Sequence, residues 1–259
     1  MKPVTLITGA SAGIGAELAR VFAGHGHELV LVARRADRLT ALAGEIAALG
    51  LPSPTVLSID LAQRDAVAMI AGELAARGLE PQIIVNNAGF GLVGHAAALG
   101  RDEQLAMIDL NARVLTELSL AFVDNVVRHR GGILNVASVA AFMPGPGFAV
   151  YYASKAFVLS FTEALHQELA PVGVKVTTLC PGPVLTEFQA RAGLSGDRTR
   201  SALTVSAERV ARAGYDGFMR GKRVVIPGIG NRVLVLLIRL VPKALLLPLL
   251  AFGNRLAAR

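Results

Sequence analysis

Residues 4–15 read VTLITGASAGIG, a short apolar run followed at once by three glycines. The run is rich in β-branched residues, as a buried strand is, and apolar residues recur at helical spacing after it. Between the two, Gly9 permits a tight turn, Gly13 lets backbone amides approach an anion, and Gly15 allows the helix to pack close to the strand. This order of strand, glycine turn and helix is typical of dinucleotide-binding domains, in which the pyrophosphate binds at the helix N-terminus.

Further short apolar runs follow along the chain, and longer segments with helical periodicity separate them. The expected strands are Val4–Thr8, Leu29–Ala33, Thr55–Ile59, Ile83–Asn86, Ile133–Ala137, Lys175–Leu179 and Val224–Ile226. The expected helices are Ile14–Ala23, Arg38–Leu49, Asp65–Arg77, Asp102–Arg128, Tyr151–Ala170 and Ala207–Arg220. Apolar strands that alternate with helices predict an α/β fold of the Rossmann type, a doubly wound, seven-stranded parallel sheet with helices on both faces. Ligands of such sheets bind beyond the carboxyl ends of the strands.

The composition excludes several classes of protein. With 259 residues the chain is long enough for one large α/β domain. Its net charge of +7 comes from scattered Lys and Arg without an array of base-stacking aromatics, so we do not expect nucleic-acid binding. Cys180 is the single cysteine and the histidines lack metal-ligand spacing, so we expect neither a disulfide nor a metal site. Residues 1–8 lack the features of a secretory signal, which favours a cytoplasmic protein.

The second expected strand ends in Ala33-Arg34-Arg35. An acidic residue at this point would bond the adenosine 2′-hydroxyl of NAD, whereas arginine accommodates the 2′-phosphate of NADP. Two guanidiniums can pair with a phosphate dianion, so the sequence favours NADP(H) over NAD(H). The alternative is that Arg34 and Arg35 are solvated loop residues, since charged residues are common at strand ends.

Tyr151 and Lys155 lie four residues apart at the start of an expected helix, so they share one helix face. A free tyrosine titrates near pH ~10. A neighbouring ammonium, together with the positive nicotinamide of an oxidised cofactor, is expected to lower the pKa of Tyr151 and make it a proton-transferring residue. Ser138 follows the fifth strand and can donate to a substrate oxygen on which negative charge develops. Tyr152 lies about 100° further around the helix and is expected to pack inward.

From about residue 3 to residue 228 the sequence resembles the compact single-domain branch of the short-chain dehydrogenase/reductase family. The resemblance lies in the glycine turn, Asp60-Leu61, Asn86-Asn87-Ala88-Gly89, Asn111, Ser138, Tyr151 with Lys155, and Pro181-Gly182, which follow one another in family order. It implies a catalytic set of Asn111, Ser138, Tyr151 and Lys155. Within this set, Asn111 is implied to hold a water molecule that links Lys155 to solvent.

The same resemblance implies a set of cofactor contacts. Asp60 is implied to hold the adenine amino group, and Asn87 with Ala88 to line the adenosine ribose. Val184 and Thr186 are implied to contact the nicotinamide amide. The complete expected set is Gly9, Ser11, Ala12, Gly13, Ile14, Gly15, Arg34, Arg35, Asp60, Leu61, Asn87, Ala88, Gly89, Tyr151, Lys155, Pro181, Gly182, Val184 and Thr186.

Three segments, residues 90–100, 140–150 and 185–203, are expected to surround the nicotinamide. They carry bulky apolar side chains, namely Phe90, Leu92, Phe142, Met143, Phe148 and Phe188. Such a lining predicts a cavity for a lipophilic substrate, for example a ketone, a 3-oxoacyl, a steroid-like or an aromatic compound. The alternative is that some of these aromatics fill the core. Residues 193–200 resemble a mobile lid.

The chain is 53% hydrophobic with a mean hydropathy of +0.52, more than a soluble domain usually has, and the surplus lies in residues 229–259. Prolines and charges interrupt this segment, which excludes a bilayer-spanning helix. Arg232, Arg239 and Lys243 fall on one side of a helical projection, so the apolar remainder can lie in a membrane interface. Equally, the segment can cover the substrate cavity or a subunit interface. We therefore divide the chain into an NADP-binding and catalytic domain, 1–228, and an apolar, basic-striped extension, 229–259.

Together these features predict an NADP(H)-dependent oxidoreductase that moves a hydride between nicotinamide and the carbonyl or alcohol carbon of a lipophilic substrate. The alternative is a catalytically silent NADP-binding sensor or scaffold, against which the intact catalytic set argues. The resemblance also implies a homodimer or homotetramer built on the helices of residues 102–128 and 151–170.

Overall fold

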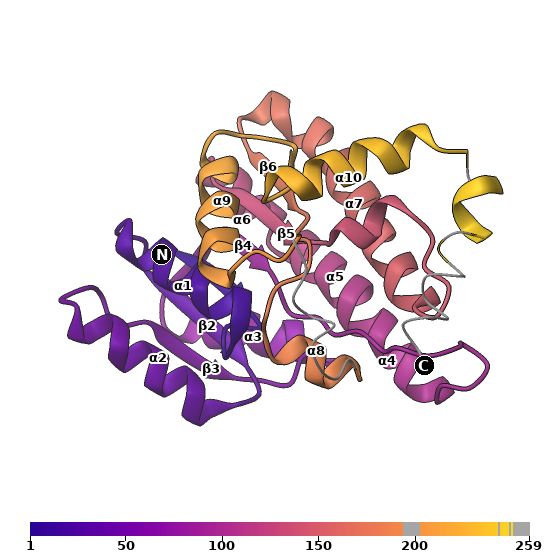
Figure 1. Cartoon of the computed structure of the whole chain (residues 1–259). Coiled ribbons are helices and arrows are strands. Elements are labelled where there is room, and N and C mark those ends of the chain that lie inside the picture. Colours follow the sequence, from indigo (N-terminus) through magenta and orange to yellow (C-terminus); the bar gives the residue numbers. More distant parts are fainter. Residues whose placement is uncertain (194–202, 243, 249, 251–259) are drawn as a thin grey trace.

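The computed structural model describes residues 1–193, 203–242, 244–248 and 250. Within these residues the chain forms one seven-stranded sheet in the order β3-β2-β1-β4-β5-β6-β7, and every neighbouring pair is parallel (Figure 1). The strands are β1 Lys2–Thr8, β2 Leu29–Ala33, β3 Thr55–Ser58, β4 Leu79–Asn86, β5 Gly132–Val136, β6 Lys175–Leu179 and β7 Val224–Val225. The doubly wound parallel fold is confirmed.

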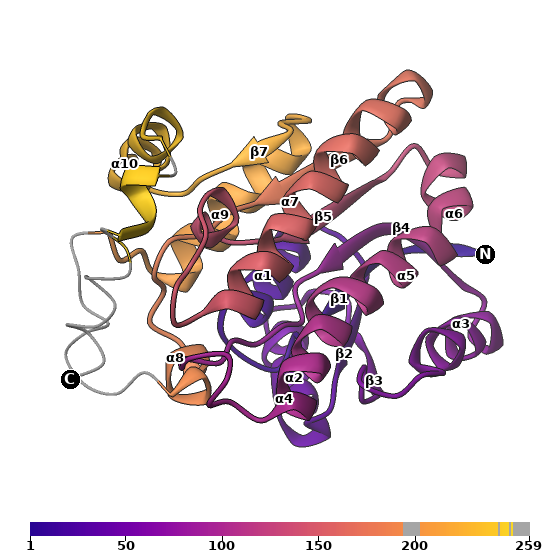
Figure 2. The ribbon, with the colours of Figure 1, turned by 90° about the vertical axis from the view of Figure 1, so that its right-hand side faces the viewer.

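Helices cover both faces of the sheet (Figure 2). They are α1 Gly13–Gly24, α2 Ala36–Ala48, α3 Ala66–Ala76, α4 Arg101–Ile108, α5 Val114–Ala121, α6 Val123–Arg128, α7 Ala149–Leu169, α8 Glu187–Ala192, α9 Ala207–Met219 and α10 Ile229–Leu240. Three short turns complete them: η1 Asp109–Arg113, η2 Val139–Phe142 and η3 Ala170–Val172. One core packs α1, α2 and α9 on the sheet, and a second core packs α3, α5, α6 and α7 on the opposite face. Both surfaces of the strands are therefore buried, which is why the strands are apolar throughout.

The expected single helix of residues 102–128 is wrong in detail. The segment divides into α4, the π-helical turn η1, α5 and α6, with a break at Phe122. Asn111 lies in the π-helical turn, where its side chain is bonded to residues outside the helix. Such turns are frequent at functional sites, and tertiary contacts rather than helical periodicity produce them.

Strand β4 begins at Leu79, four residues before the expected Ile83. Its second residue, Glu80, is only 4% exposed. A charged residue does not fit the apolar pattern from which the strands were expected, so the sequence did not indicate this start. The structure compensates its charge from α6 and the turn after it, because Asn125, Arg128 and His129 all bond the Glu80 carboxylate. These partners hold the pKa of Glu80 below its usual value even though burial raises it.

The C-terminal region docks through α10, which packs against η2. None of the helices in the described part of the chain combines the length and hydropathy needed to cross a bilayer. Part of the expected lid, residues 194–200, lies outside the described residues, as do Lys243 of the expected basic stripe and residues 251–259 of the extension.

Candidate active site

The expected catalytic residues meet at the carboxyl edge of the sheet. Ser138 lies two residues after β5, and Tyr151 and Lys155 lie in the first turns of α7. Ser138 lies beside the Tyr151 hydroxyl and opposes the rise in the pKa of Tyr151 that burial causes. Lys155 Nζ donates to the carbonyl of Val136 at 2.9 Å and lies 5.9 Å from the centroid of the Tyr151 ring. The i, i+4 spacing therefore places the amine beside the phenol, with Ser138 on its hydroxyl.

The Asn111 side chain connects η1 with the loop after β4 and with α7. Its Nδ2 donates to the Phe90 carbonyl at 2.9 Å and to Ser154 Oγ at 3.1 Å, while Oδ1 accepts from the Phe90 amide at 3.0 Å. A Cβ atom built on Gly89 would lie 2.9 Å from Asn111 Oδ1 and 3.4 Å from Lys155 Nζ. Glycine at position 89 thus leaves space between Asn111 and Lys155 that any side chain would fill.

The protonation of the site differs in one respect from the sequence-based expectation. Burial raises the pKa of Tyr151 to about 12, and the hydrogen bond with Ser138 offsets only part of this increase. Burial also lowers the pKa of Lys155 to about 8, because a buried ammonium loses its hydration. The protein's own residues therefore do not lower the pKa of Tyr151 as expected. They keep the phenol protonated at neutral pH.

The glycine turn has the expected geometry. Gly9 and Gly13 have φ values of +64° and +56°, a conformation that favours glycine. A Cβ atom on Gly15 would lie 2.3 Å from the Gly9 carbonyl oxygen, so the close approach of α1 to the turn requires glycine there. Asn87 holds the turn to the loop after β4, because its Nδ2 donates to the carbonyls of Thr8 and Gly9 at 3.0 and 3.2 Å.

Six other expected cofactor residues are buried or half-buried: Ala12, Ile14, Leu61, Ala88, Pro181 and Val184. Gly182 contacts the C-terminal region, because a Cβ atom there would lie 2.3 Å from Asn231 Oδ1 on α10. The helix that follows residue 228 is thus in contact with the site.

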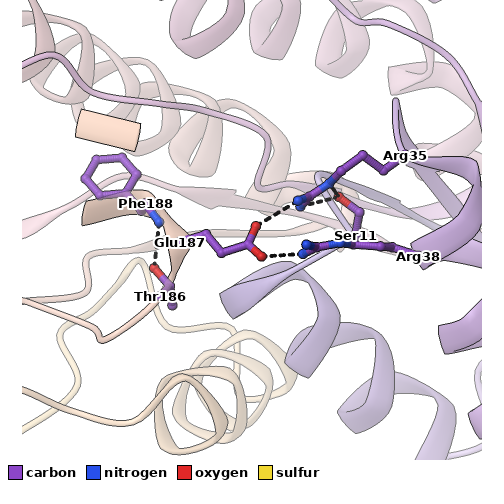
Figure 3. Close-up of polar contacts among 6 residues, drawn as sticks. All are labelled: Ser11, Arg35, Arg38, Thr186, Glu187 and Phe188. Atoms are coloured by element: carbon purple, nitrogen blue, oxygen red, sulfur yellow. Dashed lines mark hydrogen bonds and ion pairs between the residues drawn. The ribbon is translucent and has the colours of Figure 1, made fainter. Parts of the chain in front are cut away.

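Two arginines converge on a carboxylate at the end of β2 (Figure 3). Arg35 donates to Ser11 Oγ at 3.1 Å and to Glu187 Oε2 at 2.8 Å. Arg38 donates to the second oxygen, Oε1, of Glu187. The hydrogen bonds from Arg38 and Arg35 hold the pKa of Glu187 below its usual value. Arg34 instead faces Asp60 across 3.8 Å.

Arg38 and Glu187 were not among the residues expected from the sequence. Arg35 is the N-cap of α2 and Arg38 lies in its first turn, so a helix start at residue 36 rather than at the expected Arg38 would have indicated it. Glu187 is separated from Arg35 by about 150 residues of chain and had no signal of its own.

The segment 186–188 contacts both the glycine turn and the catalytic residues. A Cβ atom on Gly13 would lie 3.1 Å from Thr186 Cγ2, so Thr186 covers the turn. Glu187 reaches the arginines, and the Phe188 ring packs on Tyr151 with centroids 5.5 Å apart. One short segment therefore connects the glycine turn, the arginines and Tyr151.

The expected substrate-pocket residues divide into two groups. Phe148 and Phe188 pack around the Tyr151 ring, with centroids 6.4 and 5.5 Å from it. Phe90 and Phe142 instead lie under guanidiniums, of Arg191 at 4.5 Å and of Arg239 at 4.8 Å. Leu92 and Met143 are half-buried.

Comparison with known proteins agrees with this geometry. A sequence model described as "short chain dehydrogenase" matches residues 3–195. The chain belongs to the short-chain dehydrogenase family. The family match ends before residue 228, so it does not extend to the C-terminal segment.

Three relatives illustrate the range of this short-chain dehydrogenase family. "Sulfoacetaldehyde reductase 2" of Chromohalobacter salexigens is 39% identical over 194 residues, 73% of this chain and 75% of that protein. A short-chain dehydrogenase from Sphingobium yanoikuyae in complex with NADPH superposes with a TM-score of 0.80 at 36% identity, covering 90% of this chain and 91% of that one. The bulky-bulky ketone specific alcohol dehydrogenase from Comamonas testosteroni gives a TM-score of 0.75 at 29% identity, covering 94% and 96%. The chain is accordingly an oxidoreductase of CH–OH or C=O groups that uses a nicotinamide dinucleotide.

Proposed function

We propose that the chain is an NADPH-dependent carbonyl reductase in which Ser138, Tyr151 and Lys155 perform the proton chemistry. The observation that carries this proposal is the position of the Tyr151 ring, with the buried Lys155 amine 5.9 Å from its centroid and Ser138 beside its hydroxyl. When bound, the nicotinamide cofactor supplies the hydride. Ser138 holds the substrate oxygen, and Tyr151 gives its proton to that oxygen as the carbonyl carbon becomes a carbinol.

The direction of reduction suits the protonation of the site. A phenol whose pKa is raised to about 12 is protonated at neutral pH, which is the form that donates to a developing alkoxide. Lys155, with a pKa lowered to about 8, remains protonated at neutral pH and returns a proton to the phenolate. The gap at Gly89 between Lys155 and Asn111 supports the proposal that a water molecule there connects Lys155 to solvent.

The preference for NADPH rests on the arginines at the end of β2. Arg35 and Arg38 already bind one anionic group, the Glu187 carboxylate, and Ser11 Oγ accepts a hydrogen bond from Arg35. A 2′-phosphate is an anion of the same kind with more charge, and guanidiniums bind it in bidentate geometry. The NADPH complex of the Sphingobium yanoikuyae relative supports this choice.

We propose a lipophilic carbonyl compound as the substrate, since aromatic rings surround Tyr151 at Phe148 and Phe188. The name of the Comamonas testosteroni relative, specific for bulky-bulky ketones, supports this class. A second candidate is a small anionic aldehyde. Arg191 favours it, because its guanidinium lies over the Phe90 ring, and a sulfoacetaldehyde reductase is among the relatives.

A survey of NADPH oxidation tests the function. Aliphatic ketones, aromatic ketones, 3-oxoacyl thioesters and steroids are compared with sulfoacetaldehyde. We expect a higher kcat/KM for the lipophilic compounds, and a preference for sulfoacetaldehyde would establish the second candidate. Tyr151→Phe is expected to lose about 10²- to 10⁴-fold in turnover while retaining NADPH binding, whereas Tyr152→Phe retains activity. A sensor or scaffold would oxidise NADPH with none of these compounds.

Self-association is also proposed, through the face formed by α4, α5 and α7. Large apolar side chains are exposed there, at Leu105, Ile108, Leu120 and Phe157. Exposed apolar groups that lie on neighbouring helices favour a protein contact. The molar mass in solution tests this proposal, and Leu120→Glu with Phe157→Glu is expected to give monomers.

A further inference from the structure

Helix α10 is attached to the protein on one side and apolar and exposed on the other. Asn231, Val235 and Ile238 are buried against the domain. At about 100° per residue, the opposite side is formed by the residues we call the α10 apolar face. They are Ile229, Val233, Leu236, Leu237 and Leu240, each between 49% and 79% exposed. Figures 1 and 2 both show α10 at the outer edge of the molecule.

The exposed apolar surface continues past the end of the helix. Leu245 and Leu247 are 62% and 39% exposed. Lone exposed leucines are ordinary on a protein surface, but a contiguous group indicates an interaction site. Helix α10 thus packs on the domain with one side and exposes an apolar surface on the other, which is typical of a helix that lies in a contact surface.

Arginines border this face and line a cavity beside it. Arg232 and Arg239 lie at one edge of the α10 apolar face, between its exposed and buried sides. A cavity of about 200 Å³ lies between them and the neighbouring elements, lined by Glu163, Arg223, Val224, Ile226, Arg232 and Arg239. It contains three guanidiniums against one carboxylate.

The existing contacts leave this cavity positively charged. Glu163 pairs with Arg223 at 3.0 Å. Arg232 is oriented by a 2.8 Å hydrogen bond from Nε to the Ile226 carbonyl, and Arg239 by its position over the Phe142 ring. Neither of these contacts neutralises a guanidinium, so the cavity suits an anion such as a phosphate.

The net charge of the C-terminal segment distinguishes between two possible partners for α10, a second copy of the chain and a lipid surface. Residues 229–259 contain five basic side chains, Arg232, Arg239, Lys243, Arg255 and Arg259, and no Asp or Glu. A symmetric contact between two copies would set these cations against each other, because such an interface uses the same patch twice. An anionic lipid surface instead offers acyl chains to the leucines and phosphates to the arginines.

We propose that α10 lies in the surface of an anionic phospholipid bilayer, with its apolar face among the acyl chains and a lipid phosphate in the arginine-lined cavity. The arginines are at the depth of the headgroups when the leucines are below them, which is the usual geometry of interfacial helices. This contact does not depend on the substrate or on the choice of cofactor.

Vesicle binding of the full-length protein tests the proposal. We expect sedimentation with vesicles of phosphatidylglycerol and phosphatidylcholine, weakened by salt, and at least about tenfold weaker binding to phosphatidylcholine alone. Leu236→Asn with Leu240→Asn, and separately Arg232→Gln with Arg239→Gln, should each reduce the binding about tenfold or more. Leu49→Asn changes an exposed leucine just after α2, and Arg212→Gln an exposed arginine on α9, so both variants should bind as the wild type does.

Other outcomes would overturn the proposal. Wild-type protein that binds glycerol phosphate but not the anionic vesicles would make the cavity a site for a soluble phosphate. Loss of dimers in the leucine variant, without vesicle binding in the wild type, would make the face a subunit interface. Unchanged thermal unfolding and NADPH binding in the variants show that a loss of vesicle binding does not come from misfolding.

Discussion

Glu187 on α8 and Arg35, the residue before α2, form an ion pair with atoms 2.8 Å apart. Arg38 binds the other oxygen of the same carboxylate. Thr186 and Phe188 on either side of Glu187 contact Gly13 and Tyr151. The segment that carries this ion pair therefore connects the glycine turn with Tyr151.

Glu187 uses the donors that a 2′-phosphate needs, so the two anions should compete. We expect Glu187→Gln to tighten NADPH binding by about two- to tenfold, since exposed ion pairs are weak, and to leave NADH binding unchanged. Fluorescence titration of both cofactors measures this. Glu208→Gln, which removes another exposed partner of an arginine, is the matched control. Weaker binding of both cofactors would show that Glu187 instead clamps the dinucleotide in place.

Arg38 is expected to contribute to the choice of cofactor. Arg38→Gln should weaken NADPH about tenfold or more and NADH little, because a charge-assisted hydrogen bond to the 2′-phosphate is lost. The ratio of kcat/KM for the two cofactors measures the effect. Arg20→Gln removes an exposed guanidinium from α1 and should leave the ratio unchanged. If Arg38→Gln lowered kcat/KM equally for NADPH and NADH, Arg38 would not be a ligand of the 2′-phosphate.

The rate of carbonyl reduction should depend on the protonation of Lys155. Burial lowers the pKa of this amine to about 8, whereas burial raises the pKa of Tyr151 to about 12. The proton supply through Lys155 is therefore complete below pH 8 and is lost as the pH rises through about 8, so kcat should fall there. A profile of kcat against pH measures this. A constant kcat up to about pH 10 would contradict the role of Lys155 as proton donor.

Gly89 should be sensitive to a single methyl group. Gly89→Ala would place Cβ 2.9 Å from Asn111 Oδ1 and 3.4 Å from Lys155 Nζ. We expect kcat to fall about tenfold or more, and its inflection to move to lower pH, because the methyl group further desolvates the ammonium. Gly44→Ala on α2 meets nothing within 4 Å and should instead raise the free energy of unfolding by about 0.5–1 kcal/mol. Unaltered activity in Gly89→Ala would contradict the proposal that the space between Asn111 and Lys155 is needed for catalysis.

The fold and the central site could be predicted because their signals are local. The glycine turn, the alternation of apolar strands with helices, and the spacing of Tyr151 and Lys155 all involve residues close in the sequence. Backbone sterics and side-chain periodicity translate such spacings directly into turns, strands and helix faces. The amino-acid sequence therefore determined the sheet, the position of the phosphate turn and the pairing of the phenol with the amine.

Contacts between distant segments were decided by the tertiary structure. Burial raises the pKa of Tyr151, which the spacing of Tyr151 and Lys155 led us to expect lowered, because desolvation depends on everything packed around the ring. Three contacts likewise arise only from the tertiary structure: the burial of Glu80 in β4, the pairing of Glu187 with the arginines, and the contact of Asn231 with Gly182. Each of these contacts depends on which surfaces meet when the chain folds. The separation of two residues along the sequence does not determine whether they meet.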